Sequence, residues 1–232
     1  MSVTVDREVV RLHESVLAAA EKRLLVRMAT QLPAWVNSDH LTALGAAGML
    51  GAGACYWLAS REPLMLFGAV ACLAINWFGD SLDGTVARVR DCQRPRYGFY
   101  VDHVLDTLGI LFLLGGLGLS GYMSPMVALL LLAAYYLLNV EVYLAASVLR
   151  QFRMAFFRLG PTELRLLLAA GTAVLLVRPG VVIAGHHLRL FDVGGIAAAA
   201  ALACLFLFSA ARNTRTLYKA EPLPRRAAAR RA

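Results

Sequence analysis

The sequence is poor in charge, and acids are especially scarce. Of its 232 residues, 16% are charged and only 15 are acidic, whereas 59% are hydrophobic. The mean hydropathy is +0.62. Soluble domains carry roughly 25% charged and 45–50% apolar residues. This composition excludes a disordered chain, a coiled coil and most soluble enzymes, and it favours a protein embedded in a membrane.

Cysteine is also scarce. The four cysteines, Cys55, Cys72, Cys92 and Cys204, are scattered along the chain, and no two of them have the spacing of a metal-binding pair. Isolated cysteines inside apolar runs behave as small packing residues. We therefore expect reduced cysteines and no disulfide framework.

The charges that are present are mostly positive. The chain has 23 Lys and Arg against 15 Asp and Glu, a formal net charge of +8. A basic balance can indicate nucleic-acid binding, but in a chain this apolar it indicates basic loops facing anionic lipid headgroups. Anionic membrane lipids are therefore the expected partners, and nucleic acid is not.

Long hydrophobic runs dominate the rest of the sequence. A membrane-spanning helix needs about 20 mostly apolar residues, and the sequence offers six candidates. Because the runs are long and rich in Leu and Ala, helices are favoured over strands. We predict an all-α fold, an integral membrane bundle of six transmembrane helices. The predicted spans are 41–59, 63–88, 98–119, 124–149, 161–177 and 191–211.

The distribution of basic residues predicts how these spans are oriented. If the N-terminus is cytoplasmic, 20 of the 23 Lys and Arg fall in cytoplasmic segments, and only Arg61, Arg178 and Arg189 fall outside. Cytoplasmic loops of membrane proteins are enriched in Lys and Arg. Both termini and the loop after the second span are therefore expected in the cytoplasm, and the expected location is a bacterial inner membrane.

The two terminal segments are predicted to lie outside the bilayer core. Residues 1–36 have apolar positions at helical spacing with basic residues beside them, and charges interrupt their apolar run. They therefore do not form a signal peptide. An amphipathic helix in the membrane interface is favoured over a soluble helix docked on the bundle. The catalytic membrane domain is expected over 37–213, and a basic, disordered cytoplasmic tail over 214–232.

Four of the 15 acids lie close together at the inner ends of two predicted spans. Asp80 and Asp83 lie at the inner end of the second span, and Asp102 and Asp106 at that of the third. Ionised groups at membrane depth are costly and are usually functional. Each pair lies on one face of its helix, and the short loop between the helices makes them antiparallel neighbours. We therefore expect the two acidic faces to converge.

Converging carboxylates would repel one another, and divalent cations would remove that cost. Because all the ligands are oxygen atoms, Mg²⁺, Mn²⁺ or Ca²⁺ is expected rather than zinc. Gly84 and Ala87 leave a bare strip beside the ions, and Arg88 at its rim can pair with a phosphate. The alternative, in which the first two aspartates only pair with Arg88 and Arg90, does not account for two facing acidic stripes.

Two other polar residues within the spans carry a weaker signal. His103 points to another side of its helix than Asp102, which favours a packing or hydrogen-bonding role over a catalytic one. Glu141, deep in the fourth span, either contacts a substrate or pairs with a neighbouring helix, and the sequence favours neither. The glycines of the first span are interpreted as residues that let helices approach closely.

The aspartate motif resembles the signature of the CDP-alcohol phosphotransferase (CDP-alcohol phosphatidyltransferase) family. That signature is D-x2-D-G-x2-A-R, followed after eight or nine residues by G-x3-D-x3-D. All its fixed positions are present: Asp80, Asp83, Gly84, Ala87, Arg88, Gly98, Asp102 and Asp106. The family often begins its first span with Pro-Asn/Asp-x-Leu/Val-Thr. Residues 38–42 fit this pattern, with Ser38 in place of the proline.

The resemblance implies a reaction. A CDP-alcohol, either CDP-diacylglycerol or a CDP-linked head group, would bind through its diphosphate to two divalent ions, Mg²⁺ or Mn²⁺. An acceptor hydroxyl would then attack and release CMP, in phospholipid biosynthesis. By resemblance, the metal ligands are Asp80, Asp83, Asp102 and Asp106, and Asp106 is also the general base. The nucleotide- and phosphate-binding residues implied in the same way are Asp39, Thr42, Gly84, Ala87, Arg88 and Gly98.

The acceptor is less well defined. Residues 159–163 look like the Gly-Pro-x-Glu segment of choline/ethanolamine phosphotransferases, and Glu141 lies at a similar distance before it. Glu141, Arg150 and Arg153 are candidate acceptor-binding residues, although the positive-inside charge bias explains the arginines equally well. The family is usually homodimeric.

One alternative function is an intramembrane, carboxylate-based cation transporter, because buried Asp pairs also bind ions in transit. A transporter does not account for the glycine, alanine and arginine of the motif. It also does not explain why all four acids lie near one face of the membrane.

Overall fold

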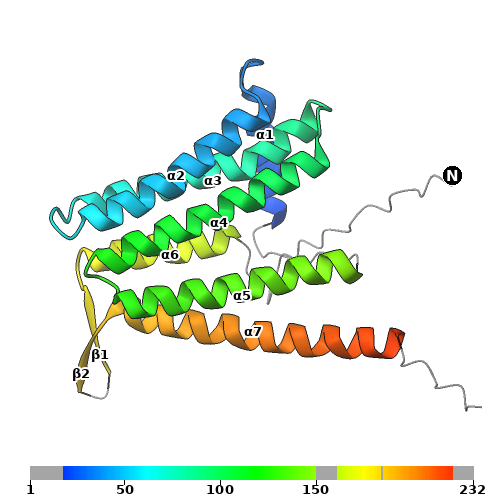
Figure 1. The fold of residues 1–232 in the computed structure, drawn as a ribbon. Helices are drawn as coiled ribbons and strands as arrows, with labels where there is room; N and C mark the ends of the chain where they lie inside the picture. Colours follow the sequence, from blue (N-terminus) through cyan, green and yellow to red (C-terminus); the bar gives the residue numbers. More distant parts are fainter. Residues whose placement is uncertain (1–17, 150–160, 184, 222–232) are drawn as a thin grey trace, which may run out of the picture.

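A computed structural model describes residues 18–149, 161–183 and 185–221 (Figure 1). This part of the chain consists of helices and one short hairpin, which confirms the predicted all-α class. The helices are α1 (Ala18–Gln31), α2 (Ser38–Leu58), α3 (Met65–Val89), α4 (Pro95–Leu119), α5 (Pro125–Leu149), α6 (Pro161–Leu175) and α7 (Leu190–Ala220). The strands are β1 (Gly180–Ile183) and β2 (His186–Arg189).

Five of these helices, α2, α3, α4, α5 and α7, are long and apolar enough to cross a membrane. The chain is therefore an integral membrane protein. The described part of α6 has 15 residues, about 22 Å at the usual rise per residue, which is short for a span. The predicted count of six spans is thus not confirmed.

The hairpin between α6 and α7 was not predicted. Its strands pair antiparallel, with Gly180 opposite Arg189 and Ile183 opposite His186. Gly185 in its turn has a φ of +82°, a conformation that glycine adopts without the steric cost other residues incur. The sixth predicted span began at residue 191, and the observed helix begins directly at the end of the hairpin.

Helix α2 packs closely against α3 and α4 because glycines line the contacts. A Cβ atom at Gly48 would lie 2.6 Å from the backbone nitrogen of Asn76, and one at Gly53 would collide with the carbonyl oxygen of Phe112. Small residues permit such close approach of helix backbones. The packing role predicted for the glycines of the first span is confirmed, and it places the start of α2 beside the acidic end of α3.

Helix α1 lies against that same end of α3 (Figure 1). Leu25 and Ala29 of α1 are buried in one apolar cluster with Leu41, Leu82 and Val86. The cluster joins the first helix to the two helices that carry the motif. The predicted interfacial role of residues 1–36 stays a prediction, since residues 1–17 lie outside the described residues.

Arg90, at the end of α3, holds the connection between α1 and α2. Its guanidinium donates hydrogen bonds to the backbone carbonyls of Leu32 at 2.9 Å and Pro33 at 3.1 Å, and also to that of Val36. Arg90 therefore braces the backbone and does not pair with the aspartates of α3.

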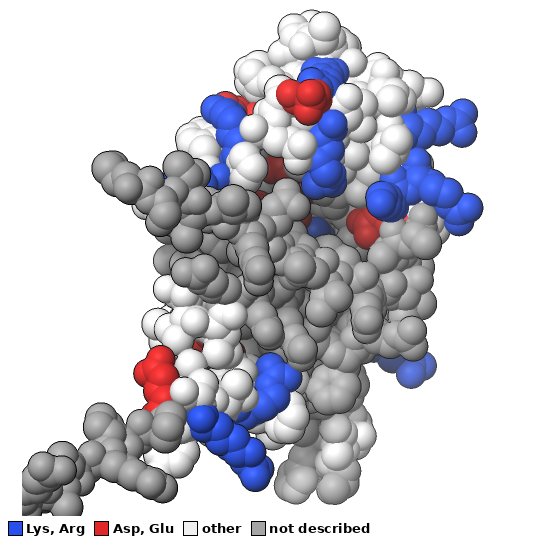
Figure 2. Space-filling view, turned by 90° about the vertical axis from the view of Figure 1, so that its right-hand side faces the viewer, with Lys and Arg blue, Asp and Glu red and all other residues white. Residues whose placement is uncertain are grey.

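Basic side chains collect at one end of the bundle. Eleven of the 14 Lys and Arg in the described residues lie toward the end where α3 finishes and α4 begins. Figure 2, which faces this end, shows blue side chains around the rim with acidic ones among them. The basic end is also the end that carries the four aspartates of the motif.

Candidate functional site

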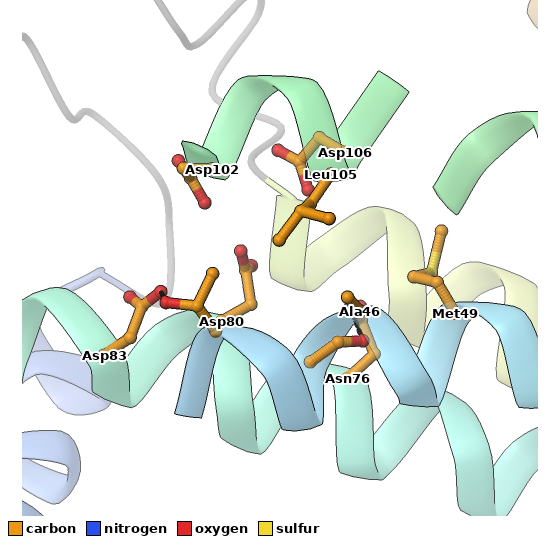
Figure 3. A pocket seen from close by; sticks show the side chains of 10 residues that line it. Ala46, Met49, Asn76, Asp80, Asp83, Asp102, Leu105 and Asp106 are labelled. Carbon is orange, nitrogen blue, oxygen red and sulfur yellow. Dashed lines mark hydrogen bonds between the residues drawn. The ribbon is translucent and has the colours of Figure 1, made fainter. Parts of the chain in front are cut away.

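The two acidic helix faces lie opposite each other across one pocket (Figure 3). Asp80 and Asp83 project from α3, and Asp102 and Asp106 project from α4 on the other side. The remaining lining residues are Thr42, Gly45, Ala46 and Met49 of α2, Asn76 of α3 and Leu105 of α4. The close α2–α3 contact at the glycines therefore gives the pocket its third wall.

Three of the four carboxylates form a tight group. Asp80, Asp102 and Asp106 each offer one oxygen atom, and these atoms all lie within 4.8 Å of one another. All the donors are carboxylate oxygens, the ligand type that Mg²⁺, Mn²⁺ and Ca²⁺ prefer. The residues present therefore fit a divalent cation.

Asp83 is held apart from this group by hydrogen bonds. Thr42 donates its hydroxyl to Oδ2 of Asp83 at 2.7 Å, and the backbone N–H of Gly84 donates to Oδ1. Ser38 donates to the backbone carbonyl of Asp83 at 3.0 Å. The fourth aspartate thus lines the same pocket, but the start of α2 fixes its orientation.

The strip expected beside the aspartates is present on α3. Ala87 is buried, and a Cβ atom at Gly84 would lie 3.3 Å from Nη1 of Arg88. The guanidinium of Arg88 therefore lies beside Gly84, and it also donates to the hydroxyl of Thr85 at 3.0 Å. This places a cation at the rim of the acidic pocket.

Of the predicted nucleotide-binding residues, only Thr42 is among the described residues that line the pocket. Gly84, Ala87 and Arg88 belong to α3, and Asp39 and Gly98 belong to the starts of α2 and α4. Asp39 is half exposed and forms an ion pair with Arg94, just before α4. The guanidinium of Arg94 lies 4.2 Å from the ring centre of Tyr97. Gly98, in the first turn of α4, is exposed. Both residues belong to the loop side of the site.

Glu141, the one candidate acceptor residue that the structure describes, is not among the residues that line the pocket. Glu141 is buried between α5 and α7, where its Oε1 accepts a hydrogen bond from the side-chain amide of Asn213 at 2.7 Å. Of the two roles left open for Glu141, the structure favours pairing with a neighbouring helix. Arg150 and Arg153 lie outside the described residues.

His103 has the surroundings of a packing residue. Its Nδ1 lies 2.8 Å from the carbonyl oxygen of Phe99, and its ring stacks on that of Phe99 with centroids 4.1 Å apart. Tyr143 meets the ring edge-on, and Nδ1 lies 3.5 Å from Oδ2 of Asp102. These contacts agree with the packing and hydrogen-bonding role expected from the sequence.

Sequence reasoning missed two residues of the site, Asn76 and Arg165. Arg165, in the second turn of α6, forms an ion pair with Asp80 and donates from Nε to Oδ1 of Asn76 at 2.7 Å. Asn76 stands four residues before Asp80, on the same helix face, so the spacing could have revealed it. Nothing local in the sequence marks Arg165, which had entered only the count of basic residues.

A family model described as CDP-alcohol phosphatidyltransferase matches residues 35–209, about three quarters of the chain. No curated protein matches the chain. The matched region contains α2 to α5, α6, the hairpin and most of α7, and therefore the whole pocket. Members of the family are transferases of phosphate-containing groups that use divalent metals. The chain belongs to the CDP-alcohol phosphatidyltransferase family, which transfers such a group from a CDP-alcohol in lipid biosynthesis.

Proposed function

We propose that the protein transfers a substituted phosphate group from a CDP-alcohol to an acceptor hydroxyl and releases CMP, with two divalent ions in the acidic pocket. The donor is CDP-diacylglycerol or a CDP-linked head group, and the ions are Mg²⁺ or Mn²⁺. The observation that carries the proposal is the group of Asp80, Asp102 and Asp106 oxygens within 4.8 Å, in a chain of this family.

The four aspartates have two roles, metal binding and proton transfer. Asp80, Asp83, Asp102 and Asp106 hold the ions, and Asp83 is oriented for this by the hydroxyl of Thr42. When bound, the ions neutralise charge on the diphosphate and on the attacking and leaving oxygens. Asp106, one turn further along α4 than Asp102, accepts the proton of the acceptor hydroxyl.

The nucleotide lies along α3 and the start of α2. Gly84 and Ala87 leave room for the donor to approach the backbone, and Arg88 pairs with a phosphate. Thr42 borders the same wall of the pocket. Asp39 and Gly98 complete the site on its loop side, where the pairing of Asp39 with Arg94 ties α2 to the start of α4.

The basic end of the bundle supports a cytoplasmic active site. Lys and Arg are enriched on the cytoplasmic side of membrane proteins, and this end carries both the aspartates and most of the described basic residues. In this orientation α6 provides the sixth span and the basic segment 214–232 meets anionic lipid. The start of that segment was expected to be disordered, but residues up to Ala220 belong to α7. We also propose that the enzyme is a homodimer in a bacterial inner membrane. A cation transporter is disfavoured by the position of the acids at one end and by the family match.

The third component of the reaction is the acceptor alcohol. Arg150 and Arg153 remain candidates for binding it, whereas the pairing of Glu141 with Asn213 does not favour the same role for Glu141.

An assay of CMP release tests the proposal. Purified protein is incubated with CDP-diacylglycerol and a panel of polar alcohols, or with CDP-linked head groups and diacylglycerol, in the presence of Mn²⁺. We expect CMP release only when donor, acceptor and metal are all present, and a chelator should abolish it. Asp102→Asn serves as the inactive control. Absence of CMP release with every pair of substrates would refute the proposed function.

A further inference from the structure

Arg165 places a positive charge against the acidic pocket from a helix outside the motif. Its Nη2 donates to Oδ2 of Asp80, and only 17% of the Arg165 side chain and 22% of the Asp80 side chain are exposed. At the same time its Nε donates to Oδ1 of Asn76 at 2.7 Å. Asn76 is itself buried and donates from Nδ2 to the carbonyl of Gly45 at 2.9 Å. The guanidinium is therefore anchored by a neutral side chain and directed at a carboxylate.

The helix that carries Arg165 is fixed in place one turn earlier. The hydroxyl of Thr162 donates to Oε1 of Glu21 at 2.6 Å, and the indole N–H of Trp77 donates to the same oxygen at 2.9 Å. Glu21 of α1 thus ties the first turn of α6 to α3. The backbone of α6 is therefore fixed relative to α1 and α3, and Arg165 extends from it to Asp80.

A guanidinium and a divalent ion at Asp80 repel each other and compete for the same carboxylate. Without metal, the carboxylates repel one another, and Arg165 relieves part of that repulsion. Two divalent ions would already balance the four carboxylates, so the charge of Arg165 becomes surplus and weakens ion binding. A donor diphosphate brings two negative charges, and guanidinium groups bind phosphate oxygens well. The surplus charge is then balanced.

We propose that Arg165 is a built-in counter-ion of the metal site, which competes with divalent ions for Asp80 and makes ion and donor bind cooperatively. The inference rests on the proposed function, because it takes the acidic pocket to be the metal and donor site. Arg165 is held at Asp80 while the site is empty and pairs with the diphosphate when the donor binds.

Mn²⁺ binding tests the inference without any reaction. Free Mn²⁺ is measured by electron paramagnetic resonance on protein in nanodiscs of zwitterionic lipid, with and without a short-chain CDP-diacylglycerol, and protein-free titrations correct for Mn²⁺ held by the donor itself. The variants are Arg165→Gln, Arg165→Lys and, as a control, Arg61→Gln, an exposed arginine beyond the other end of α2.

Arg165→Gln should bind Mn²⁺ about tenfold more tightly than wild type without donor, and the gain in affinity caused by the donor should fall by a similar factor, within the usual range of coupling between ligands. Arg165→Lys keeps the charge and should stay close to wild type without donor. Arg61→Gln should behave as wild type. Equal or weaker Mn²⁺ binding by Arg165→Gln would overturn the inference, because it would mean that Arg165 only orients Asp80.

Thermal unfolding provides a second measurement that does not depend on the binding titration. Without metal, Arg165→Gln should unfold at a lower temperature than wild type, and saturating Mn²⁺ should raise its unfolding temperature more than that of wild type. An equal metal-induced rise in both proteins would contradict the counter-ion role. Failure of the proposed function looks different: wild type would release no CMP, or neither protein would bind Mn²⁺.

Discussion

Acidic side chains are buried or partly buried at two places in the described structure, and the two places differ in the groups that surround the carboxylates. Asp80, Asp102 and Asp106 face one another across a pocket, with their oxygens within 4.8 Å. Glu141 is more deeply buried, but it faces the amide of Asn213 between α5 and α7. A carboxylate that meets other carboxylates needs a cation, whereas one that meets an amide is already partly satisfied. Burial alone therefore does not mark a functional acid; its neighbours do.

The largest expected effect comes from the acid proposed as general base. Asp106→Asn keeps the shape of the side chain and one oxygen but removes the proton acceptor. Transfer should fall by about 10²–10⁴-fold, the usual contribution of a general base, while binding of metal and CDP-donor persists. Calorimetric donor binding at saturating Mg²⁺, measured beside CMP release, checks this. Near-normal turnover would show that the base lies elsewhere.

The same experiment separates base from ligand. Asp83→Asn removes a charge that Thr42 and Gly84 hold in place, and it should lose metal and donor binding together. If Asp106→Asn loses metal as completely as Asp83→Asn, then Asp106 is chiefly a ligand and the proton leaves through another group.

The next largest effect separates two arginines at the end of α3. Arg88→Ala should weaken donor binding by about 10- to 150-fold, the equivalent of the 1.5–3 kcal/mol of a charge-assisted hydrogen bond, with little change in unfolding temperature. Arg90→Ala should do the reverse, because Arg90 donates to the backbone carbonyls of Leu32 and Pro33. Donor binding and thermal unfolding are measured on both variants. If both variants lose the same donor affinity, Arg88 makes no specific contact with the donor phosphate.

The pocket could be predicted from the sequence because its four aspartates lie close together along the chain. Asp80, Asp83, Asp102 and Asp106 follow helical spacing in two helices joined by a short loop, so periodicity alone brings the two faces together. The partners that come from distant segments could not be found in this way. Arg165 lies 85 residues from Asp80, and no local pattern records that contact.

The hairpin between the two C-terminal helices was missed for a different reason. The run 180–183 is apolar, and next to an apolar helix it is too short for periodicity to identify it as a strand. Arg178, Pro179 and Gly180 interrupt the helical pattern, and Gly185 permits the turn. The partner of Glu141 was equally hidden, since Asn213 lies 72 residues further along the chain.

A smaller effect is expected outside the pocket, at the contact that positions α6. Glu21→Leu leaves the indole N–H of Trp77 and the hydroxyl of Thr162 without their acceptor, and the free energy of unfolding should fall by about 1–3 kcal/mol. Glu21→Gln keeps an acceptor oxygen and should lose much less. Chemical denaturation in detergent compares the two. A loss as large in the glutamine variant would mean that the charge of Glu21, and not its hydrogen bonds, stabilises the contact.

The smallest effect is expected at Glu141. Glu141→Gln retains an oxygen that can accept from Asn213, and it removes a charge whose second oxygen, Oε2, is buried without a hydrogen-bond partner among the described residues. Because an unpaired buried charge is costly, stability should be unchanged or slightly higher. Because Glu141 does not line the pocket, transfer should stay within about threefold of wild type, which corresponds to a barrier change of well under 1 kcal/mol. Steady-state CMP release over a range of acceptor concentrations is the measurement. If the variant instead raises the KM for the acceptor more than tenfold while donor binding is unchanged, Glu141 contacts the acceptor, and the contrast between the two buried acidic settings disappears.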